Sequence, residues 1–281
     1  MSANPFLEVN NLNVVFHTKS ASGMFNKEHN HAVKNVSFSV YEGEVLSLVG
    51  ESGCGKTTIG RVITHLEHAG TGEIIYAGQN ILTMSDTRFR PLRKQIQMIF
   101  QDPYASLNPR LTVEKTLSEP LFIHKLVKNR SDARTKIAAM LNEVGLNAEA
   151  MDRYPHEFSG GQRQRIGIAR VMMVQPRLII ADEAVSALDV SIQAQVLNLL
   201  KQLQRSSGVA MLFISHDLAV VRHISDRIAV MYQGEIVELN ETRQIFEQPQ
   251  HEYTQRLLSS IPVIPSRKNI EPTLSSNGGM L

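Results

Sequence analysis

The sequence has little of three features that mark special classes of protein. Its single cysteine among 281 residues excludes an internal disulfide and a cysteine-ligated metal cluster within this chain. Lys and Arg total 29 against 27 for Asp and Glu, and a net charge of +2 does not indicate a polyanionic partner. No apolar run approaches the roughly 18 residues of a membrane span, and the opening MSANPFLEV lacks the basic-then-apolar order of a secretory signal. We therefore expect a cytoplasmic protein that does not bind nucleic acid.

What is present is the composition of an ordinary globular protein, with 42% hydrophobic and 20% charged residues. A chain of 281 residues is long enough to bury a large core. One large domain or two small ones are both compatible with this length.

The stretch Gly50–Thr57 (GESGCGKT) fits the phosphate-binding pattern G-x-x-x-x-G-K-[ST] at every fixed position. The apolar run Glu44–Val49 before it predicts a buried parallel strand. The following Lys56–His68 predicts a helix, because its apolar residues recur at the i, i+3, i+4, i+7 spacing of one helical face. A glycine-rich turn before a helix is the alternative, but the order strand, glycine loop, helix favours a nucleotide site.

The residue types of this loop suit a polyphosphate. Its glycines allow positive φ and a close approach of the backbone to an anion, and its amides and the helix N-terminus, which carries about half a positive charge, point at phosphate oxygens. We expect Lys56 to neutralise the β- and γ-phosphates and the Thr57 hydroxyl to hold Mg²⁺. The candidate nucleotide contacts here are Gly50, Glu51, Ser52, Gly53, Cys54, Gly55, Lys56, Thr57 and Thr58.

The N-terminal part of the chain predicts an antiparallel sheet beside the nucleotide core. Alternating apolar residues predict strands or hairpins at 6–15, 33–41 and 72–81. The polar stretch Thr18–His31 between the first two predicts a loop. His17, His29 and His31 raise the possibility of a metal site, but they have no carboxylate or cysteine partners, so this reading is not favoured.

The rest of the chain alternates apolar strands with helices, which indicates an α/β fold. Buried strands are predicted at 95–100, 178–181 and 209–214, and a hairpin at 228–239. The block Leu111–Met151 has a helical pattern and no convincing strand, with Ser131 as a helix cap and Gly145 as a stop. A further helix is predicted from Phe158–Gln162 to Val174, and the tail after Pro265 is predicted to be disordered.

Six separated stretches match one family, the ATP-binding-cassette (ABC) ATPases, in order and spacing. Gly50–Thr57 resembles their phosphate loop, Gln101 their Q-loop, Phe158–Gln162 (FSGGQ) their LSGGQ signature, Leu178–Glu183 their Walker B strand, Ser186–Asp189 (SALD) their D-loop and His216 their switch histidine. Any one of these pieces is weak evidence, but six in sequence leave very little room for accident. The resemblance implies a P-loop NTPase (RecA-like) core with an N-terminal antiparallel β subdomain and an inserted α-helical subdomain.

Longer stretches resemble the ATPase subunits of bacterial oligopeptide/dipeptide importers. They are QDPYASLNPR (101–110), RYPHEFSGGQRQRIGIAR (153–170), SALDVSIQAQVLNLL (186–200), ISHDLAVVRHISDR (214–227) and HEYTQRLLSSIP (251–262). Nickel importers of the same subfamily are similar, so the solute stays open between peptides and nickel or a metal chelate.

The resemblance also implies a domain organisation. We expect an ABC ATPase domain over 1–245, with the helical subdomain inserted at about 102–175, and a C-terminal extension over 246–281 that is disordered after about 265. One departure is Ala184, in DEAV, where the family usually has proline. Alanine removes a fixed φ but no reactive group, so we expect activity to be retained.

By resemblance, each remaining site residue has a role. Asp182 holds Mg²⁺, Glu183 is the base for the attacking water, Gln101 contacts Mg²⁺ and this water, and His216 contacts the γ-phosphate. Two solvated acids and a solvated histidine are the plain alternatives, but a strand end aims such groups at the crevice where α/β sheets bind ligands. Phe16 is the candidate to stack on adenine, with a core aromatic as the competing reading.

The signature residues offer a second anion site at a helix start: Ser159, Gly160, Gly161 and Gln162. In the family, two ATPases face each other head to tail, and each signature closes over the ATP of the other. The resemblance therefore implies a second ATPase subunit, which the subfamily pattern suggests is a different chain, although a homodimer is possible.

The resemblance implies a peripheral Mg-ATPase on the cytoplasmic face of the inner cell membrane. Its further partners are two membrane permease subunits and, indirectly, an extracytoplasmic solute-binding protein. The helical block, with Tyr104 and Leu107 near its start, would supply the surface that docks on the permease subunits. A soluble ABC ATPase of DNA repair or translation is the alternative from another class. Repair versions need a long coiled coil between Lys56 and Ser159, and translation versions carry two cassettes, whereas this sequence has one and no such coil. Lys56, Glu183 and His216 argue against a degenerate, non-catalytic site.

Overall fold

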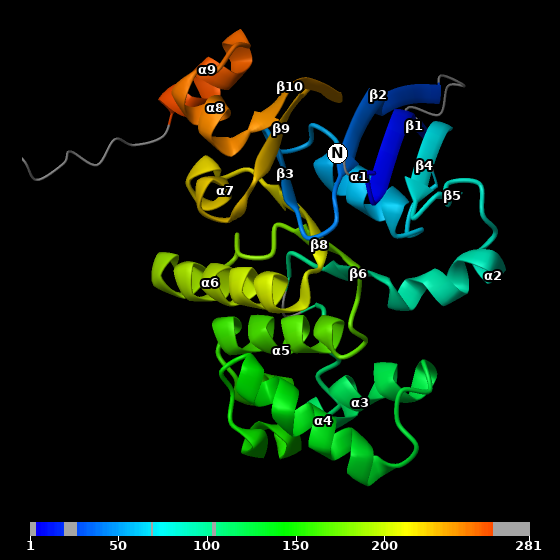
Figure 1. Ribbon diagram of the computed structural model, residues 1–281, viewed down its shortest axis with the longest axis vertical. Helices are drawn as coiled ribbons and strands as arrows, with labels where there is room; N and C mark the ends of the chain where they lie inside the picture. The colour runs from blue at the N-terminus through cyan, green and yellow to red at the C-terminus, as the bar shows by residue number, and fades with distance from the viewer. Residues whose placement is uncertain (1–3, 20–26, 69, 103–104, 261–281) are drawn as a thin grey trace, which may run out of the picture.

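The larger of two β-sheets forms the centre of the protein (Figure 1). The structure is a computed structural model that describes residues 4–19, 27–68, 70–102 and 105–260. The six strands of this sheet, in the order β10-β9-β3-β8-β7-β6, are all parallel except β10, which pairs antiparallel with β9. They are β3 (Val45–Val49), β6 (Ile96–Ile99), β7 (Leu178–Asp182), β8 (Ala210–Ser215), β9 (Arg227–Tyr232) and β10 (Glu235–Glu241).

Both faces of this sheet are buried, as the continuous apolar runs predict. In β3, Val45 and Val49 face the cluster that includes the helices, whereas Leu46 and Leu48 face the cluster that includes the second sheet. The same division occurs in β8, where Phe213 and Ile214 belong to opposite clusters. The sheet therefore separates two hydrophobic cores, and the accessible parts are the ends of its strands.

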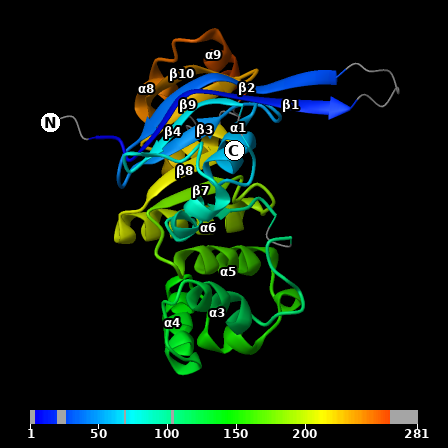
Figure 2. The same ribbon diagram turned by 90° about the vertical axis from the view of Figure 1, so that its right-hand side faces the viewer.

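The smaller sheet is antiparallel, in the order β2-β1-β4-β5. Its strands are β1 (Leu7–Lys19), β2 (Lys27–Val40), β4 (Thr71–Tyr76) and β5 (Gln79–Asn80). The loop predicted over Thr18–His31 is wrong at both ends, because β1 continues to Lys19 and β2 begins at Lys27. Figure 2 shows β1 and β2 extending together beyond the body as a ribbon. Strands that extend beyond the core need no apolar face. The polar composition of this stretch therefore predicted a loop, although β1 and β2 pair there.

The helices lie mostly on the other side of the large sheet. They are α1 (Lys56–Ile63), α2 (Asp86–Phe89), α3 (Val113–Ile123), α4 (Arg130–Glu143), α5 (Gly160–Met172), α6 (Val190–Ser207), α7 (Leu218–Ile224), α8 (Thr242–Glu247) and α9 (Glu252–Ser259), with 3₁₀ turns at Arg90–Lys94, Ala148–Asp152 and Pro155–Glu157. In both views α3 and α4 lie at the end farthest from the small sheet, and α5 lies between them and α6 (Figures 1 and 2). The predicted class is confirmed: an α/β core with an N-terminal antiparallel sheet and an inserted helical subdomain. The predicted domain boundaries stay predictions.

Several helix ends differ from the predicted ones. The helix after the phosphate loop ends at Ile63, not His68, because His65 has a φ of 56° and turns the chain. Leu66, whose spacing suggested a longer helix, is 56% exposed. The cap of α4 is Asn129, whose side chain accepts from Asp132 N, and not Ser131. Helix α5 ends at Met172 rather than Val174.

The C-terminal part contributes two short helices, α8 and α9, that periodicity alone did not predict. The predicted disorder after Pro265 and the predicted docking residue Tyr104 lie outside the described residues. Across the described ranges, no helix is both long and apolar enough to cross a membrane.

The helical subdomain contains a buried carboxylate, Glu114 on α3, which is 6% exposed. Arg130 Nε donates to it at 2.8 Å, and Arg134 donates to its other oxygen. The hydrogen bond from Arg130 lowers the pKa of the Glu114 carboxyl from its ordinary value of 4.5. A lowered pKa means that the carboxylate stabilises the fold above its unfolded pKa and that this stabilisation is lost as pH falls through the folded pKa.

We predict that Glu114→Gln lowers the thermal unfolding temperature near pH 7, and that this difference from the parent shrinks as the pH falls below the ordinary pKa of 4.5. The measurement is thermal unfolding followed by circular dichroism between pH 3 and 7. The control is Glu119→Gln, which alters an exposed carboxylate on the same helix. A parent–variant difference that grows towards low pH would contradict the assignment.

Candidate nucleotide-binding site

Four neighbouring strands of the large sheet end at one edge, and each is followed by a predicted site residue. In sheet order, β3 leads into the phosphate loop, β8 into His216, β7 ends at Asp182, and β6 precedes Gln101. Parallel pairing aligns the carboxyl ends of these strands, which is where open α/β sheets bind ligands. Residues far apart in sequence are therefore collected along one edge.

The phosphate loop curls around the ammonium group of Lys56, the first residue of α1. Lys56 is 4% exposed, and its Nζ donates to the carbonyl oxygens of Gly50 and Glu51, each at 2.8 Å. Only glycine suits position 50, because a Cβ there would lie 2.2 Å from the carbonyl oxygen of Met231. The loop thus presents a buried cation at the start of a helix, which is an arrangement for binding an anion.

The remaining loop residues differ in exposure. Glu51, Ser52 and Gly53 are exposed, whereas Thr58 is half-buried. Cys54 is buried, and its Sγ lies 3.5 Å from Lys56 Nζ. The first part of the loop is therefore exposed to solvent, and the second part is buried against the sheet.

Thr57 and Asp182 meet across the sheet edge. Thr57 Oγ1 donates to Asp182 Oδ1 at 2.9 Å, and the Asp182 residue is 5% exposed. Burial raises the pKa of the Asp182 carboxyl above its ordinary value, and the Thr57 hydrogen bond opposes this rise. A hydroxyl and a desolvated carboxylate side by side are oxygen ligands of the kind that a hard cation prefers.

Glu183 connects the other two predicted catalytic residues. Gln101 Nε2 donates to Glu183 Oε2 at 2.9 Å, and His216 Nδ1 lies 3.1 Å from Glu183 Oε1. The φ of Glu183 is 45°, a left-handed conformation that is uncommon for a residue other than glycine. The backbone therefore turns sharply after Asp182, and this turn directs the two adjacent carboxylates to different partners.

The signature residues lie elsewhere. Ser159 caps α5, its Oγ accepting from Gln162 N at 3.3 Å while Gln162 Oε1 accepts from Ser159 N at 3.0 Å. Gly161 is tightly packed, since a Cβ there would lie 2.3 Å from Ile192 Cγ2. In both views α5 is well separated from α1 (Figures 1 and 2). Within one chain, the structure does not bring this helix start to the phosphate loop.

Phe16 lies on β1 and is half-buried against the cluster shared by the two sheets. Its predicted contact with adenine stays a prediction. Among the described side chains, no group of three or more His, Cys, Asp or Glu residues is suited to a metal ion. His31 Nε2 instead lies 3.2 Å from Asn13 Oδ1, and the side chains of His17 and His29 lie outside the description.

The structure adds one neighbour of the phosphate loop that the sequence analysis did not name, Tyr253 on α9. Its hydroxyl oxygen accepts a hydrogen bond from Glu51 N at 3.2 Å. In the sequence, residues 251–262 were noted only for their resemblance to the peptide-importer subfamily. That resemblance did not predict a contact between Tyr253 and the phosphate loop.

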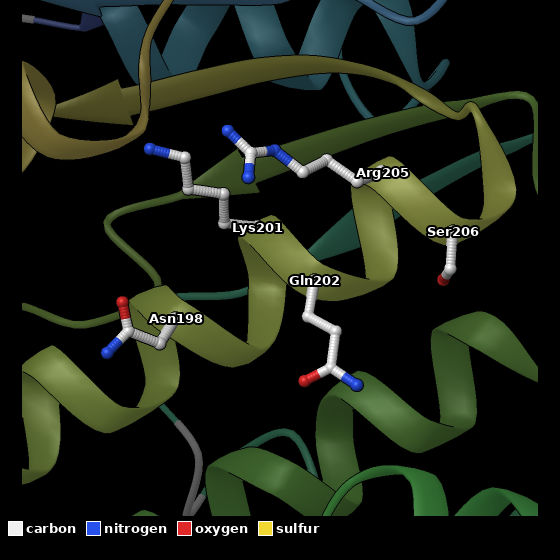
Figure 3. A pocket seen from close by; sticks show the side chains of 5 residues that line it. All are labelled: Asn198, Lys201, Gln202, Arg205 and Ser206. Atoms are coloured by element: carbon white, nitrogen blue, oxygen red, sulfur yellow. The ribbon is translucent and has the colours of Figure 1, made fainter.

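A separate hollow lies along α6 and has no catalytic character (Figure 3). Its lining side chains all come from that helix: Asn198, Lys201, Gln202, Arg205 and Ser206. Lys201 Nζ donates to the carbonyl oxygen of His223 at 2.6 Å. With no carboxylate and a single supporting element, this hollow is not a second candidate active site.

These features define a P-loop nucleotide-binding protein, and comparison with known proteins narrows the class. The family described as ABC transporter matches residues 33–186, and the one described as Oligopeptide/dipeptide transporter, C-terminal region, matches residues 237–278. The chain therefore belongs to the ABC transporter family. The resemblance predicted from the sequence is confirmed, including its peptide-importer subfamily.

Two similar relatives are named Glutathione import ATP-binding protein GsiA. The protein from Pectobacterium atrosepticum is 52% identical over 275 residues, and that from Escherichia coli is 53% identical over 276 residues. Each alignment covers 97% of this chain and 44% of the relative. The chain thus spans less than half the length of these curated relatives.

Solved structures agree on the fold. The ATP-binding cassette MJ0796, described as dimeric in a post-hydrolysis state with ADP and Pi, has a TM-score of 0.74 and 27% identity, covering 84% of this chain and 99% of that one. The cbiO1 structure from Clostridium perfringens also has a TM-score of 0.74, with 24% identity over 87% of this chain and 92% of that one, and supports the fold alone. The chain has the fold of an ATP-binding cassette.

We predict that Gly50→Ala abolishes nucleotide binding, because the new Cβ has no space beside the Met231 carbonyl and displaces the acceptors of Lys56. Gly53→Ala is the matched control in the same loop. A Cβ at position 53 meets nothing within 4 Å, so only the strain of its φ of 83° remains, roughly 1–2 kcal/mol. Equilibrium binding of a fluorescent ATP analogue compares the two. Equally tight binding by both variants would refute the steric argument.

Proposed function

We propose that this chain is the ATP-hydrolysing subunit of a bacterial ABC importer that takes up di- or oligopeptides. The observation that carries the proposal is the meeting of Lys56, the Thr57–Asp182 pair and Glu183 at one sheet edge. The peptide class is supported by the C-terminal family match and by relatives named for import of glutathione, itself a short peptide. These findings favour peptides over nickel or a metal chelate.

In this proposal the phosphate loop binds the triphosphate of ATP. The buried Lys56 ammonium neutralises the β- and γ-phosphates, and the amides at the start of α1 donate to phosphate oxygens. The structure fits this role because Lys56 is held by two backbone carbonyls, which are uncharged and leave its charge uncompensated. Phe16 stacks on the adenine ring from β1, and His216 contacts the γ-phosphate.

Magnesium fits the oxygen groups at the sheet edge. We propose that Thr57 and Asp182 hold Mg²⁺, with Gln101 contributing its side-chain oxygen, a set consistent with the few protein ligands that Mg²⁺ takes. When bound, the ion supplies neutralisation of phosphate charge. The raised pKa of Asp182 supports this assignment, since desolvation disfavours the lone carboxylate and a cation beside it restores the charged form.

Glu183 is proposed as the general base. Its side chain is 14% exposed, so it is close to solvent yet restrained by Gln101 and His216. A carboxylate held in this way orients a water molecule towards the γ-phosphate and accepts its proton. Gln101, which lies at the entry to the helical subdomain, links this carboxylate to the segment that follows β6.

The start of α5 is proposed to act on the nucleotide of a second ATPase subunit. It offers exposed Ser159, half-buried Gly160 and buried Gly161 at a helix N-terminus that does not approach the phosphate loop of its own chain. Head-to-tail pairing with another cassette, different or identical in sequence, provides the missing phosphate. The dimeric state named for the related cassette MJ0796 supports such an arrangement.

The helical subdomain is proposed to dock on two permease subunits at the cytoplasmic face of the cell membrane, with an extracytoplasmic solute-binding protein as an indirect partner. Exposed apolar side chains of this subdomain, Phe122 at 45% and Ile123 at 62%, support a protein contact. Leu107, which lies near the start of the predicted helical block, is 3% exposed and packs in the core.

We predict that Glu183→Gln slows ATP turnover by on the order of a hundredfold or more while leaving ATP binding intact, since it removes the base but keeps the size of the side chain and one acceptor oxygen. Phosphate release under saturating Mg-ATP, together with equilibrium nucleotide binding, measures both quantities. Glu235→Gln, at an exposed site on β10, is the control. Turnover near that of the parent would remove Glu183 from this role.

We predict that Ser159→Arg retains nucleotide binding but abolishes hydrolysis, because the signature acts on the ATP of the partner. The decisive measurement mixes Ser159→Arg with Lys56→Ala, which retains an intact signature but cannot hold phosphate. Head-to-tail pairing leaves one composite site with both intact halves, so partial activity should return. A mixture as inactive as each variant alone would exclude head-to-tail pairing between copies of this chain.

A further inference from the structure

The peptide group that joins Gly50 to Glu51 lies between two side chains from opposite ends of the chain. Its carbonyl oxygen accepts from Lys56 Nζ at 2.8 Å, and its N–H donates to the Tyr253 hydroxyl at 3.2 Å. A peptide group is planar, so rotating it moves both the oxygen and the hydrogen. Tyr253 therefore restrains the same group that provides one of the two carbonyl acceptors of the Lys56 ammonium.

The Tyr253 hydroxyl is delivered to the loop by an anchored element. The carboxylate of Glu238 on β10 accepts from Gln250 N at 2.9 Å and from His251 N at 3.0 Å, immediately before α9. His251 Nδ1 then accepts from Tyr253 N at 3.1 Å and caps the helix. These bonds fix the first turn of α9 relative to the large sheet.

The Tyr253 ring is fixed as well. The residue is 4% exposed, and its ring centroid lies 4.2 Å from that of Tyr232 at the end of β9. Because β9 pairs in parallel with β3, the strand that leads into the phosphate loop, Tyr232 and the loop belong to one rigid edge. Burial raises the pKa of the Tyr253 phenol, which keeps its hydroxyl neutral.

A purely structural contact is the competing explanation, and the surroundings argue against it. Beside the contact is a cavity of about 210 Å³, lined by Glu51, Tyr232, Tyr253, Arg256, Leu257 and Ser260. Glu51 itself is exposed. The hydroxyl thus reaches the loop at the edge of a hollow, and what it adds there is a directional bond to one amide.

We propose that Tyr253 is a positioning residue for phosphate binding, which orients the Gly50–Glu51 peptide so that Lys56 is held ready for the phosphates. The inference rests on the proposed function. It assigns the C-terminal region, whose family match covers residues 237–278, a direct part in nucleotide binding. Loss of the hydroxyl frees the peptide to rotate, so the loop must be reordered each time ATP binds.

The consequence is a selective change in affinity. Glu183, Gln101 and His216 do not contact Tyr253, so the hydrolytic step with ATP already bound should be little altered. We expect Tyr253→Phe to raise the Kd for ATP by about three- to tenfold, the range for loss of one hydrogen bond. KM for ATP should rise similarly, with kcat within about twofold of the parent.

The test uses the full chain and a fluorescent, non-hydrolysable ATP analogue with Mg²⁺. Tyr232→Phe is the matched control, because it removes the hydroxyl of the neighbouring ring, which accepts from Gln233. It should bind like the parent. The thermal unfolding temperature of Tyr253→Phe without nucleotide should fall by no more than the loss of one hydrogen bond allows, whereas the stabilisation produced by a fixed nucleotide concentration should shrink.

A second variant tests the route through α9. Glu238→Ala removes the acceptor that holds Gln250 N and His251 N, and it should weaken analogue binding in the same direction. Adding Tyr253→Phe to it should cost less than Tyr253→Phe alone costs in the parent, because both act through one contact.

Three results would overturn the inference. Unchanged affinity in Tyr253→Phe, with or without a lower unfolding temperature, would leave the contact structural. Equal weakening by Tyr232→Phe would show that the bond from Glu51 N to the Tyr253 hydroxyl is not what carries the effect. Failure of the parent itself to bind the analogue would remove the proposed function and this inference together, and only that result affects both.

Discussion

The buried ammonium of Lys56 is the constraint on which the rest of the site depends. A positive charge that is 4% exposed is costly unless oxygen acceptors replace water, and here the carbonyls of Gly50 and Glu51 do so. The loop must curl back on itself to supply them, which requires a backbone at Gly50 that passes against the Met231 carbonyl of β9. The phosphate loop is therefore shaped by the pairing of β3 with β9 as well as by its own sequence.

The same sheet aligns the acidic residues with that cation. Because β8 lies between β3 and β7, the Thr57 hydroxyl reaches Asp182 across one strand, and His216 at the end of β8 lies beside Glu183. A sheet buried on both faces leaves its carboxyl edge as the place where polar groups gather. The C-terminal helix α9 reaches this edge from outside, so the C-terminal region contacts the loop of the candidate nucleotide site.

Most of the elements were predictable because their signals are local. Apolar runs marked β3, β7 and β8, and the capping serine and glycines marked the start of α5. Predictions failed where local signals competed. The apolar spacing over Lys56–His68 predicted a helix that continues past Ile63, where α1 ends. The left-handed backbone conformation of His65 stops the helix even though the apolar periodicity continues. The polar ribbon of β1 and β2 was missed because strands outside the core need no apolar alternation.

The sequence by itself determined the chemical groups and the class of the protein, since the loop pattern, the acidic pair and the signature depend on short-range spacing. The tertiary structure alone decided which groups meet. It joined Gln101 and His216 to Glu183, separated Ser159 from the phosphate loop of its own chain, and brought Tyr253 to Glu51 across some two hundred residues. Sheet order and the anchoring of α9 set these contacts, and both arise from long-range pairing that no local pattern records.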